Sequence, residues 1–531
     1  MSDVLDAVII GGGHNGLVCG AYLARAGRRV LVLERRHLVG GAAVTEELWP
    51  GYRVSTASYT MALLQPRIIL DLELARHGFK VLKPTPMFMP LEGGRGMVWH
   101  DDMHRLGEQI AAFSRHDAQA YPRYREFMTR LGETARRLMF ELPPEIEVGS
   151  FRDAWRLCGL AWRHRGSRRQ VYDLYDALTL SAYDFLARWF ESDEMRAALG
   201  FYAAGGGANS GIKSPGSAYV LLRGFVRDNA TEAGGSGFVQ GGMGGISNAI
   251  AASGQAHGLR IRTGATVSRV CVERGRAKGV ELDSGERIDA AVVICNASAQ
   301  TLFRKLVSQE HLSEAFLSDV EHIRDESTVF KLNLGLRALP VFKGFDAQAH
   351  GFGYPAQVRI GPSTDYIERS FDPSKYGDFA RRPVMTLVTP SVVDPTLAPP
   401  GRHVMSIMGQ HAPYRLRGRS WDEARSGLRQ AALDTLEEFA PGFAATVEHE
   451  QLLTPADFER IFDLPRGHVH HGELSLDQMF FRRPVRHWAQ FRTPIPGLFQ
   501  CGASVHPGGG VTGVPGYNAA RAILTRGTSW T

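Results

Sequence analysis

The chain has 531 residues, of which 44% are hydrophobic and 22% charged, a balance that excludes disordered, collagen-like and coiled-coil designs. This length predicts two or three structural units. The net charge of +6 comes without the dense basic runs of nucleic-acid-binding proteins, so no nucleic-acid partner is expected. The 59 glycines exceed the usual share of about 7% and indicate tight turns and close approaches of the backbone.

The cysteines and the distribution of apolar residues predict a cytoplasmic protein, or one of the mitochondrial matrix in a eukaryote. No C-x-x-C pair is present, which argues against a zinc ribbon or a thioredoxin-like redox pair. The five cysteines stand far apart, as expected in a reducing compartment: Cys19, Cys158, Cys271, Cys295 and Cys501. Asp3 and Asp6 lead directly into an apolar run, unlike a signal peptide. The longest uncharged stretches, such as 238–259, are rich in polar residues, so no transmembrane helix is predicted.

The first forty residues predict a β-α-β unit. The apolar run 7–10 is typical of a buried strand, 17–26 of a helix that stops at Gly27, and 30–33 of a second buried strand. This order places one strand-to-helix turn within residues 11–16, where the sequence is glycine-rich.

The turn carries a dinucleotide-binding pattern. Gly11, Gly13 and Gly16 form G-x-G-x-x-G, which lets the backbone approach a pyrophosphate at the N-terminus of the helix. Glu34 ends the second strand, where it can accept hydrogen bonds from a ribose. A second glycine pair, Gly40-Gly41, follows soon after. It is typical of a loop that also touches the phosphates of a flavin dinucleotide, although an ordinary glycine turn remains open.

Later segments resume the same kind of unit. A glycine cluster at 241–245 precedes a small-residue helix predicted over 246–257. Strands are then predicted at 260–262, 266–272, 279–282 and 290–295, and again at 498–501. Gly508, Gly510 and Gly513 repeat the G-x-G-x-x-G spacing, but too few residues follow for a second β-α-β unit. These segments are interpreted as the rest of one nucleotide-binding domain that an insertion interrupts.

Four motifs carry a resemblance that spans nearly the whole chain: VIIGGGHNGLV at 8–18, GGAA at 40–43, SLDQ at 475–478 and HPGGGVTG at 506–513. They resemble the phytoene desaturase-like FAD-dependent oxidoreductases. The resemblance is greatest to the branch of the O-type β-carotene ketolase and the pyridine nucleotide-disulphide oxidoreductase domain-containing protein 2. No C-x-x-x-x-C pair is present, so disulphide reduction is not expected.

The resemblance implies an α/β fold. It has a Rossmann-type FAD-binding domain of the glutathione reductase and amine oxidase-like superfamily, with an inserted mixed α+β substrate domain. The implied FAD-binding segments are 1–60, 235–300 and 485–531. The implied substrate domain comprises 61–234, with a helical and membrane-facing part, and 301–484, with a mixed sheet.

The resemblance also implies FAD as the cofactor and assigns its contacts. The glycine-rich turn would face the pyrophosphate, Glu34 the ribose, the 40–42 loop the phosphates, Val267 the adenine and the C-terminal segment the isoalloxazine. The implied cofactor-binding residues are Gly11, Gly13, His14, Asn15, Gly16, Glu34, Arg35, Gly40, Gly41, Ala42, Val267, Gly502, Ala503, Gly513 and Val514. Many flavoproteins of the wider fold have Gly-Asp at 502–503, so a carboxylate contact to the ribityl phosphate is not expected here. A helix starting near residue 513 would direct its positive end at the pyrimidine side of the flavin.

Flavin chemistry needs orientation and an apolar pocket, with no catalytic triad or metal. Polar candidates near the flavin, chosen for their place in the motifs, are Tyr59, His471, Asp477 and His506, and a structural hydrogen-bonding role remains open for each. His468 and His470 would share one face of a strand. No Cys or H-E-x-x-H accompanies them, so no metal site is predicted.

Residues 151–169 predict an amphipathic helix. One face carries Phe151, Ala154, Trp155, Cys158 and Trp162, and arginines cluster at 152, 156, 163, 165, 168 and 169. Such a helix can rest on anionic lipid, as a peripheral membrane contact. The alternative is an ordinary surface helix with its tryptophans packed inward.

The leading hypothesis is an FAD-dependent oxidoreductase that acts on a hydrophobic, isoprenoid- or carotenoid-like small molecule by dehydrogenation, oxidation or flavin-assisted isomerisation. Two alternatives stay open: an amine oxidase-type flavoenzyme, and a non-catalytic binding protein like the Rab GDP dissociation inhibitors, which resemble this fold. No second nucleotide-binding unit is found, so oxygen or a membrane quinone is the expected electron acceptor. The sequence leaves the oligomeric state open.

Overall fold

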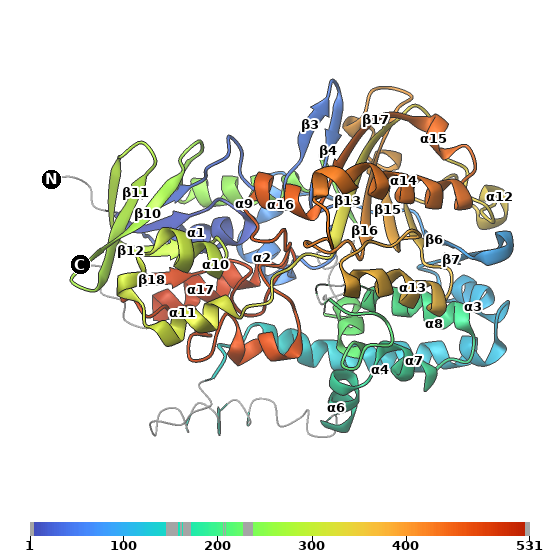
Figure 1. Ribbon diagram of the computed structural model, residues 1–531, viewed down its shortest axis with the longest axis horizontal. Coiled ribbons are helices and arrows are strands. Elements are labelled where there is room, and N and C mark those ends of the chain that lie inside the picture. Colours follow the sequence, from blue (N-terminus) through green and yellow to red (C-terminus); the bar gives the residue numbers. More distant parts are fainter. Residues whose placement is uncertain are drawn as a thin grey trace.

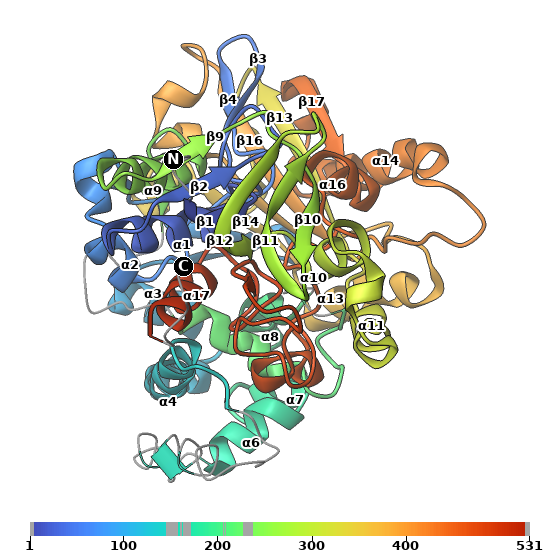
Figure 2. The ribbon, with the colours of Figure 1, turned by 90° about the vertical axis from the view of Figure 1, so that its left-hand side faces the viewer.

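The computed structural model describes residues 5–144, 171–204, 209–226 and 237–525, together with positions 155, 158, 159, 162 and 207. Within these residues two seven-stranded sheets lie side by side along the long axis of the molecule (Figure 1). We call them the first and the second sheet. Figure 2 looks onto the end formed by the first sheet, with β10, β11 and β12 facing the viewer.

The first sheet collects strands from distant parts of the chain. Its order is β10-β11-β12-β1-β2-β9, and β18 pairs with β12. The pairs of β1 with β2 and β12, of β2 with β9 and of β12 with β18 are parallel, whereas β10, β11 and β12 form an antiparallel meander. The strands are β1 (Leu5–Ile10), β2 (Val30–Leu33), β9 (Arg260–Arg262), β10 (Val267–Glu273), β11 (Arg276–Leu282), β12 (Arg287–Cys295) and β18 (Leu498–Gln500).

Helix α1 (His14–Arg25) packs against α9 (Gly244–Ala256) and α17 (Val514–Thr525). The helix α1 begins three residues earlier than the sequence predicts, because the glycine-rich turn itself forms its first turn. The packing needs glycine at two close approaches. A Cβ on Gly16 would lie 2.3 Å from the carbonyl oxygen of Gly11, and one on Gly516 would lie 2.2 Å from that of Asn15. A parallel sheet covered by such helices is the doubly wound arrangement predicted for these segments.

The second sheet is mixed, with the order β17-β13-β16-β15-β14-β6-β7. Its pairs are antiparallel except for β14 with β6. The strands are β6 (Met87–Pro90), β7 (Gly96–Trp99), β13 (Val329–Leu336), β14 (Gln357–Ile360), β15 (Met385–Val388), β16 (His403–Gln410) and β17 (Val447–Leu453). Two short antiparallel pairs complete the strands: β3 (Glu46–Trp49) with β4 (Tyr52–Val54), and β5 (Val81–Leu82) with β8 (Phe238–Val239).

The two faces of the second sheet differ in character. Alternate residues of β13 and β14, among them Leu332, Val358 and Ile360, belong to one large hydrophobic core that also contains Leu428 of α14 (Trp421–Phe439). Because side chains alternate along a strand, the residues between them point to the opposite face. We call that opposite face, which carries Arg359, the inner face.

Helices flank the second sheet, and Figure 1 shows α4, α7 and α8 below it. The remaining α-helices are α2 (Pro66–Asp71), α3 (Met103–Ala111), α4 (Arg115–Met139), α6 (Val171–Thr179), α7 (Ala182–Ala187), α8 (Asp193–Gly200), α10 (Ala299–Thr301), α11 (Glu314–Glu321), α12 (Ala347–His350), α13 (Thr364–Phe371), α15 (Phe443–Thr446) and α16 (Pro455–Phe462). None of the described helices is long and apolar enough to cross a membrane.

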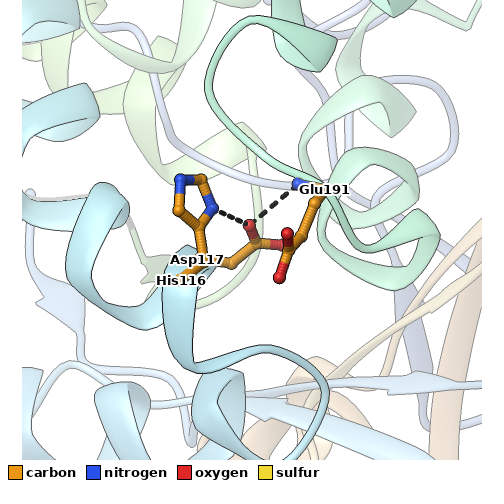
Figure 3. A group of neighbouring side chains, drawn as sticks. All are labelled: His116, Asp117 and Glu191. Carbon is orange, nitrogen blue, oxygen red and sulfur yellow. Dashed lines mark hydrogen bonds and ion pairs between the residues drawn. The ribbon is translucent and has the colours of Figure 1, made fainter.

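A buried carboxylate joins α4 to the turn before α8 (Figure 3). Asp117 accepts hydrogen bonds from the amides of Glu191 and Ser192, both at 2.9 Å, and from the ring of His116 at 3.1 Å. Burial opposes ionisation of this carboxyl, but the hydrogen bonds from Ser192 and the amides outweigh it and lower its pKa. Both carboxylate oxygens therefore accept hydrogen bonds from the protein itself, and we assign Asp117 a structural role.

Most of the predicted amphipathic stretch 151–169 lies outside the described residues. Trp155 and Trp162 are described, and both are exposed.

Residues 55–57 connect the two halves of the molecule, of which the first contains the first sheet and the second contains the second sheet. On β13, the amine of Lys331 donates to the carbonyl oxygens of Ser55 at 2.8 Å and Ala57 at 2.6 Å. The amide of Asn333 donates to the carbonyl oxygen of Thr56 at 3.2 Å. Burial lowers the pKa of Lys331 well below its ordinary value, because it disfavours the charged form of the amine.

The lowered pKa of Lys331 predicts a pH dependence of stability. The unfolded chain binds a proton at this amine below its ordinary pKa of about 10.4, whereas the folded protein releases that proton at a lower pH, so folding is favoured as pH rises toward about 10.4. Relative to Lys331→Met, the free energy of unfolding of the native protein should rise by up to about 1.4 kcal/mol per pH unit as pH approaches this value from below. Urea unfolding measures this difference, with the exposed Lys343→Met as control. A difference that does not change with pH would contradict the assignment.

Candidate cofactor and substrate cavity

One cavity connects the first sheet with the inner face of the second. Its volume is about 1500 Å³. A single small-molecule site usually occupies about 300–1,000 Å³, so this cavity has room for two ligands. Its walls include Gly13 and Glu34 from the first half of the molecule and Arg359 and Thr386 from the inner face.

The N-terminus of α1 opens into this cavity. Gly13 is its N-cap residue, and no side chain caps the helix, so its first amides have no acceptor within the helix. Asn15 lines the cavity, and its buried Oδ1 atom has no hydrogen-bond partner. His14 lies 3.3 Å from the carbonyl oxygen of Gly510, and burial lowers the pKa of its ring to about 4. The free amides of this helix end suit an anion such as a phosphate, and the Oδ1 atom of Asn15 can accept a hydrogen bond from a hydroxyl or N–H group of a ligand.

Glu34 is held rigidly at the end of β2. It is 6% exposed, and its two oxygens accept hydrogen bonds from the amides of Gly12 at 2.7 Å and Arg36 at 2.9 Å. This places a fixed carboxylate at the cavity wall, beside the glycine-rich turn.

Most of the cofactor-binding residues expected from the sequence line the cavity. These are Gly11, Gly13, His14, Asn15, Glu34, Arg35, Gly40, Gly41, Ala42, Val267 and Ala503. The guanidinium of Arg35 also donates to the carbonyl oxygen of Ile461 at 2.7 Å. The other four, Gly16, Gly502, Gly513 and Val514, are not among the lining residues. A Cβ on Gly502 would lie 2.2 Å from the carbonyl oxygen of Asn296, so close packing already requires glycine there.

Asn296 also lines the cavity, although it is not among the site residues predicted from the sequence. It follows β12, and its amide donates to the carbonyl oxygen of Ile10 at the end of β1. A Cβ on Gly13 would lie 2.7 Å from its Nδ2 atom. The signal in the sequence was its position, since a polar residue directly after a buried parallel strand lies at the edge where ligands bind.

Two of the four candidate catalytic residues line the cavity. Burial raises the pKa of Tyr59, whose ring centroid lies 5.0 Å from the amine of Lys331. His471 has a φ of 55°, and burial lowers the pKa of its ring to about 3. Both side chains are therefore neutral near pH 7.

The expectation that His468 and His470 share a strand face is wrong. The segment is a tight turn, in which the Nδ1 atom of His468 accepts hydrogen bonds from the amides of His470 at 3.2 Å and Gly472 at 3.3 Å. The turn brings the rings of His468 and His470 within 6.0 Å of each other, and both residues line the cavity.

The other two candidates are not among the lining residues. Asp477 is half exposed and forms hydrogen bonds at 2.7 and 2.8 Å with the guanidinium of Arg324, which lowers its pKa to about 2. The ring of His506 lies 2.9 Å from the carbonyl oxygen of Leu138, and burial lowers its pKa to about 4. These contacts give each side chain a structural partner outside the cavity.

Comparison with known proteins matches residues 16–524 to the flavin containing amine oxidoreductase family. The pyridine nucleotide-disulfide oxidoreductase domain-containing protein 2 of Rattus norvegicus is 41% identical over 98% of this chain and 93% of its own length. One of the subunits of the limonene dehydrogenase of Castellaniella defragrans is 30% identical, over 98% of this chain and 95% of its own. A lycopene-forming phytoene desaturase of Pseudescherichia vulneris is 26% identical, over 97% and 98%.

Solved structures share the fold. An oxidoreductase from Methanosarcina mazei superposes with a TM-score of 0.60 at 18% identity, covering 98% of this chain and all of the other. Putrescine oxidase bound to putrescine gives a TM-score of 0.60 at 16% identity, covering 98% and 99%. These matches confirm the predicted fold class, the phytoene desaturase-like resemblance and FAD as the cofactor. The chain belongs to the flavin containing amine oxidoreductase family and is a flavin-dependent oxidoreductase.

Proposed function

We propose that the protein oxidises or dehydrogenates an apolar small molecule in the shared cavity. The observation that carries the proposal is the continuity of the cavity, which extends from the glycine-rich turn to a compartment whose lining includes large apolar side chains. That compartment is lined by Met87, Trp99, Leu106, Leu199, Phe225 and Phe238, among others. The names of two relatives, a limonene dehydrogenase and a phytoene desaturase, support an isoprenoid or carotenoid-like substrate.

We propose that the lining residues of the first half hold the FAD. The uncapped N-terminus of α1, with Gly13 and Asn15, would receive the pyrophosphate, and Glu34 would accept from the ribose. The residues fit this group, because the uncapped amides of α1 can donate to the phosphates, the unpartnered Oδ1 atom of Asn15 can accept from a hydroxyl of the cofactor, and the space at Gly13 leaves no room for a Cβ. Bound FAD supplies a hydride acceptor. Together these residues would form a cofactor cradle. Four further residues would pack behind it: Gly16, Gly502, Gly513 and Val514.

Uncharged side chains at the cavity wall would orient the substrate through hydrogen bonds. Tyr59 and His471 are neutral near pH 7, so they can form hydrogen bonds with a substrate and exclude water from an apolar wall. We propose structural roles for Asp477 and His506, because both side chains have partners outside the cavity.

We also propose a peripheral membrane contact near residues 151–179. The helix α6 exposes Tyr172, Tyr175 and Val171 by 85%, 64% and 57%, next to the arginine-rich 151–169 stretch of the sequence. Apolar and basic side chains together favour an anionic bilayer surface. This placement would give access to lipid-soluble substrates and to a quinone as electron acceptor, with oxygen as the alternative acceptor.

Replacing Gly13 by Val should abolish stable FAD binding. The added side chain would displace the Nδ2 atom of Asn296, 2.7 Å from the new Cβ, and fill the space that the pyrophosphate needs. The flavin-to-protein ratio of the purified protein measures the effect. Gly107→Val is the matched control, because nothing lies within 4 Å of a Cβ at that position. Stoichiometric FAD in Gly13→Val would refute the assignment of this turn.

Anaerobic mixing of the FAD-loaded protein with polyenes, retinoids and amines should identify the substrate class by bleaching of the flavin. We expect bleaching by an apolar polyene or retinoid and none by hydrophilic amines, because the compartment beside the cradle is mainly apolar.

The same experiment has a nucleotide arm. NADH and NADPH should not bleach the flavin rapidly, since the described residues contain a single parallel nucleotide-binding unit. Saturable bleaching by either nucleotide would overturn the proposed electron acceptors, and bleaching by amines alone would favour an amine oxidase.

A further inference from the structure

Arg359 stands in the middle of the inner face of the second sheet. On β14 it is directly opposite Thr386 of β15, which is opposite Met408 of β16. All three line the cavity, while Val358 and Ile360 on either side of Arg359 belong to the hydrophobic core behind the sheet. Strand alternation therefore aims the guanidinium group into the cavity.

This guanidinium group is buried with few partners. The residue is 8% exposed, and its Nη2 atom donates to the hydroxyl of Tyr202 at 2.8 Å. The group stacks over the rings of Tyr202 and Phe201, at 4.2 and 5.3 Å from their centroids. Its Nε atom is buried without an acceptor, and no carboxylate of the described residues forms an ion pair with it. Of the five N–H groups of an arginine, the structure gives one an acceptor.

The acidic residues of the cavity are engaged elsewhere. Glu34 accepts from two backbone amides, Asp101 pairs with Lys83 at 3.2 Å, and Asp463 lies 3.5 Å from Lys305. Arg223 lines the same cavity, and like Arg359 it acts on Tyr59 in the sense that lowers the pKa of the phenol, against the larger effect of burial.

A buried cation is costly unless an anion accompanies it, and the described side chains offer none. We propose that the anion belongs to the substrate: an apolar molecule that carries a carboxylate, which Arg359 binds while the apolar lining takes the chain. The planar guanidinium matches a carboxylate in geometry and in charge. Tyr202 holds the guanidinium in place. This inference rests on the proposed function, to which it adds the substrate's polar end.

Calorimetric titration of the FAD-loaded protein with three probes separates the two parts of the substrate. Decanoate has the chain and the carboxylate, decanol has the chain alone, and acetate has the carboxylate alone. We expect decanoate to bind roughly 10- to 100-fold more tightly than decanol, the range of one charge-assisted interaction. Acetate should bind far more weakly than decanoate, because it buries little apolar surface.

Variants then assign the effect to Arg359. Arg359→Met should abolish the tighter binding of decanoate relative to decanol. Arg359→Lys keeps the positive charge, so it serves as the test if the Met variant does not fold, and it should retain a smaller difference in affinity. Lys83→Met, at an exposed and paired lysine of the same cavity, should leave the difference in affinity unchanged.

Each opposing outcome has a distinct meaning. Equal affinities for decanoate and decanol would overturn the carboxylate proposal while leaving an apolar substrate in place. Acetate binding as tightly as decanoate would overturn the apolar substrate instead. Loss of FAD from both Arg359 variants would place this residue in the cofactor site and also overturn the inference.

Discussion

Three consecutive backbone carbonyls, those of residues 55–57, are hydrogen-bonded to two buried side chains of β13, Lys331 and Asn333. The segment directly follows β4 and reaches the cavity wall at Ala57. Because both side chains come from the second sheet, these bonds connect that sheet to a segment that continues into the cavity wall. The amine of Lys331 suits this task, since it donates to two carbonyls and burial lowers its pKa, which reduces the cost of a buried charge.

The cavity combines two kinds of wall. Near the turn of His468–His471 the titratable side chains are neutral, because burial disfavours the charged form of the imidazoles. On the inner face a permanent cation, Arg359, is held by stacking and one hydrogen bond. A substrate with an apolar chain and one anionic end matches this distribution. The cavity would also orient such a substrate, since only the anionic end of the substrate has a counterion in Arg359.

Local sequence patterns predicted much of the first sheet. The strands 30–33 and 260–262 have the predicted bounds, because their apolar or alternating residues are flanked by clear stop signals. Strands β11 and β12 each begin three residues earlier than predicted, since their first residues are charged and form ion pairs such as that of Arg287 with Asp289. The inner face escaped prediction because the row of Arg359, Thr386 and Met408 depends on the register of three strands that are distant in sequence. The ion pair of Asp477 also escaped prediction, because its partner Arg324 lies on a segment that is distant in sequence.

A crystal structure of the FAD-loaded protein would show whether one cavity holds the cofactor and the substrate between the two sheets. We expect the pyrophosphate at the N-terminus of α1 beside Gly13, and the isoalloxazine directed toward the inner face, with open volume left over Arg359. An isoalloxazine that points away from the second sheet, or that stacks on Arg359 and fills this volume, would contradict this expectation.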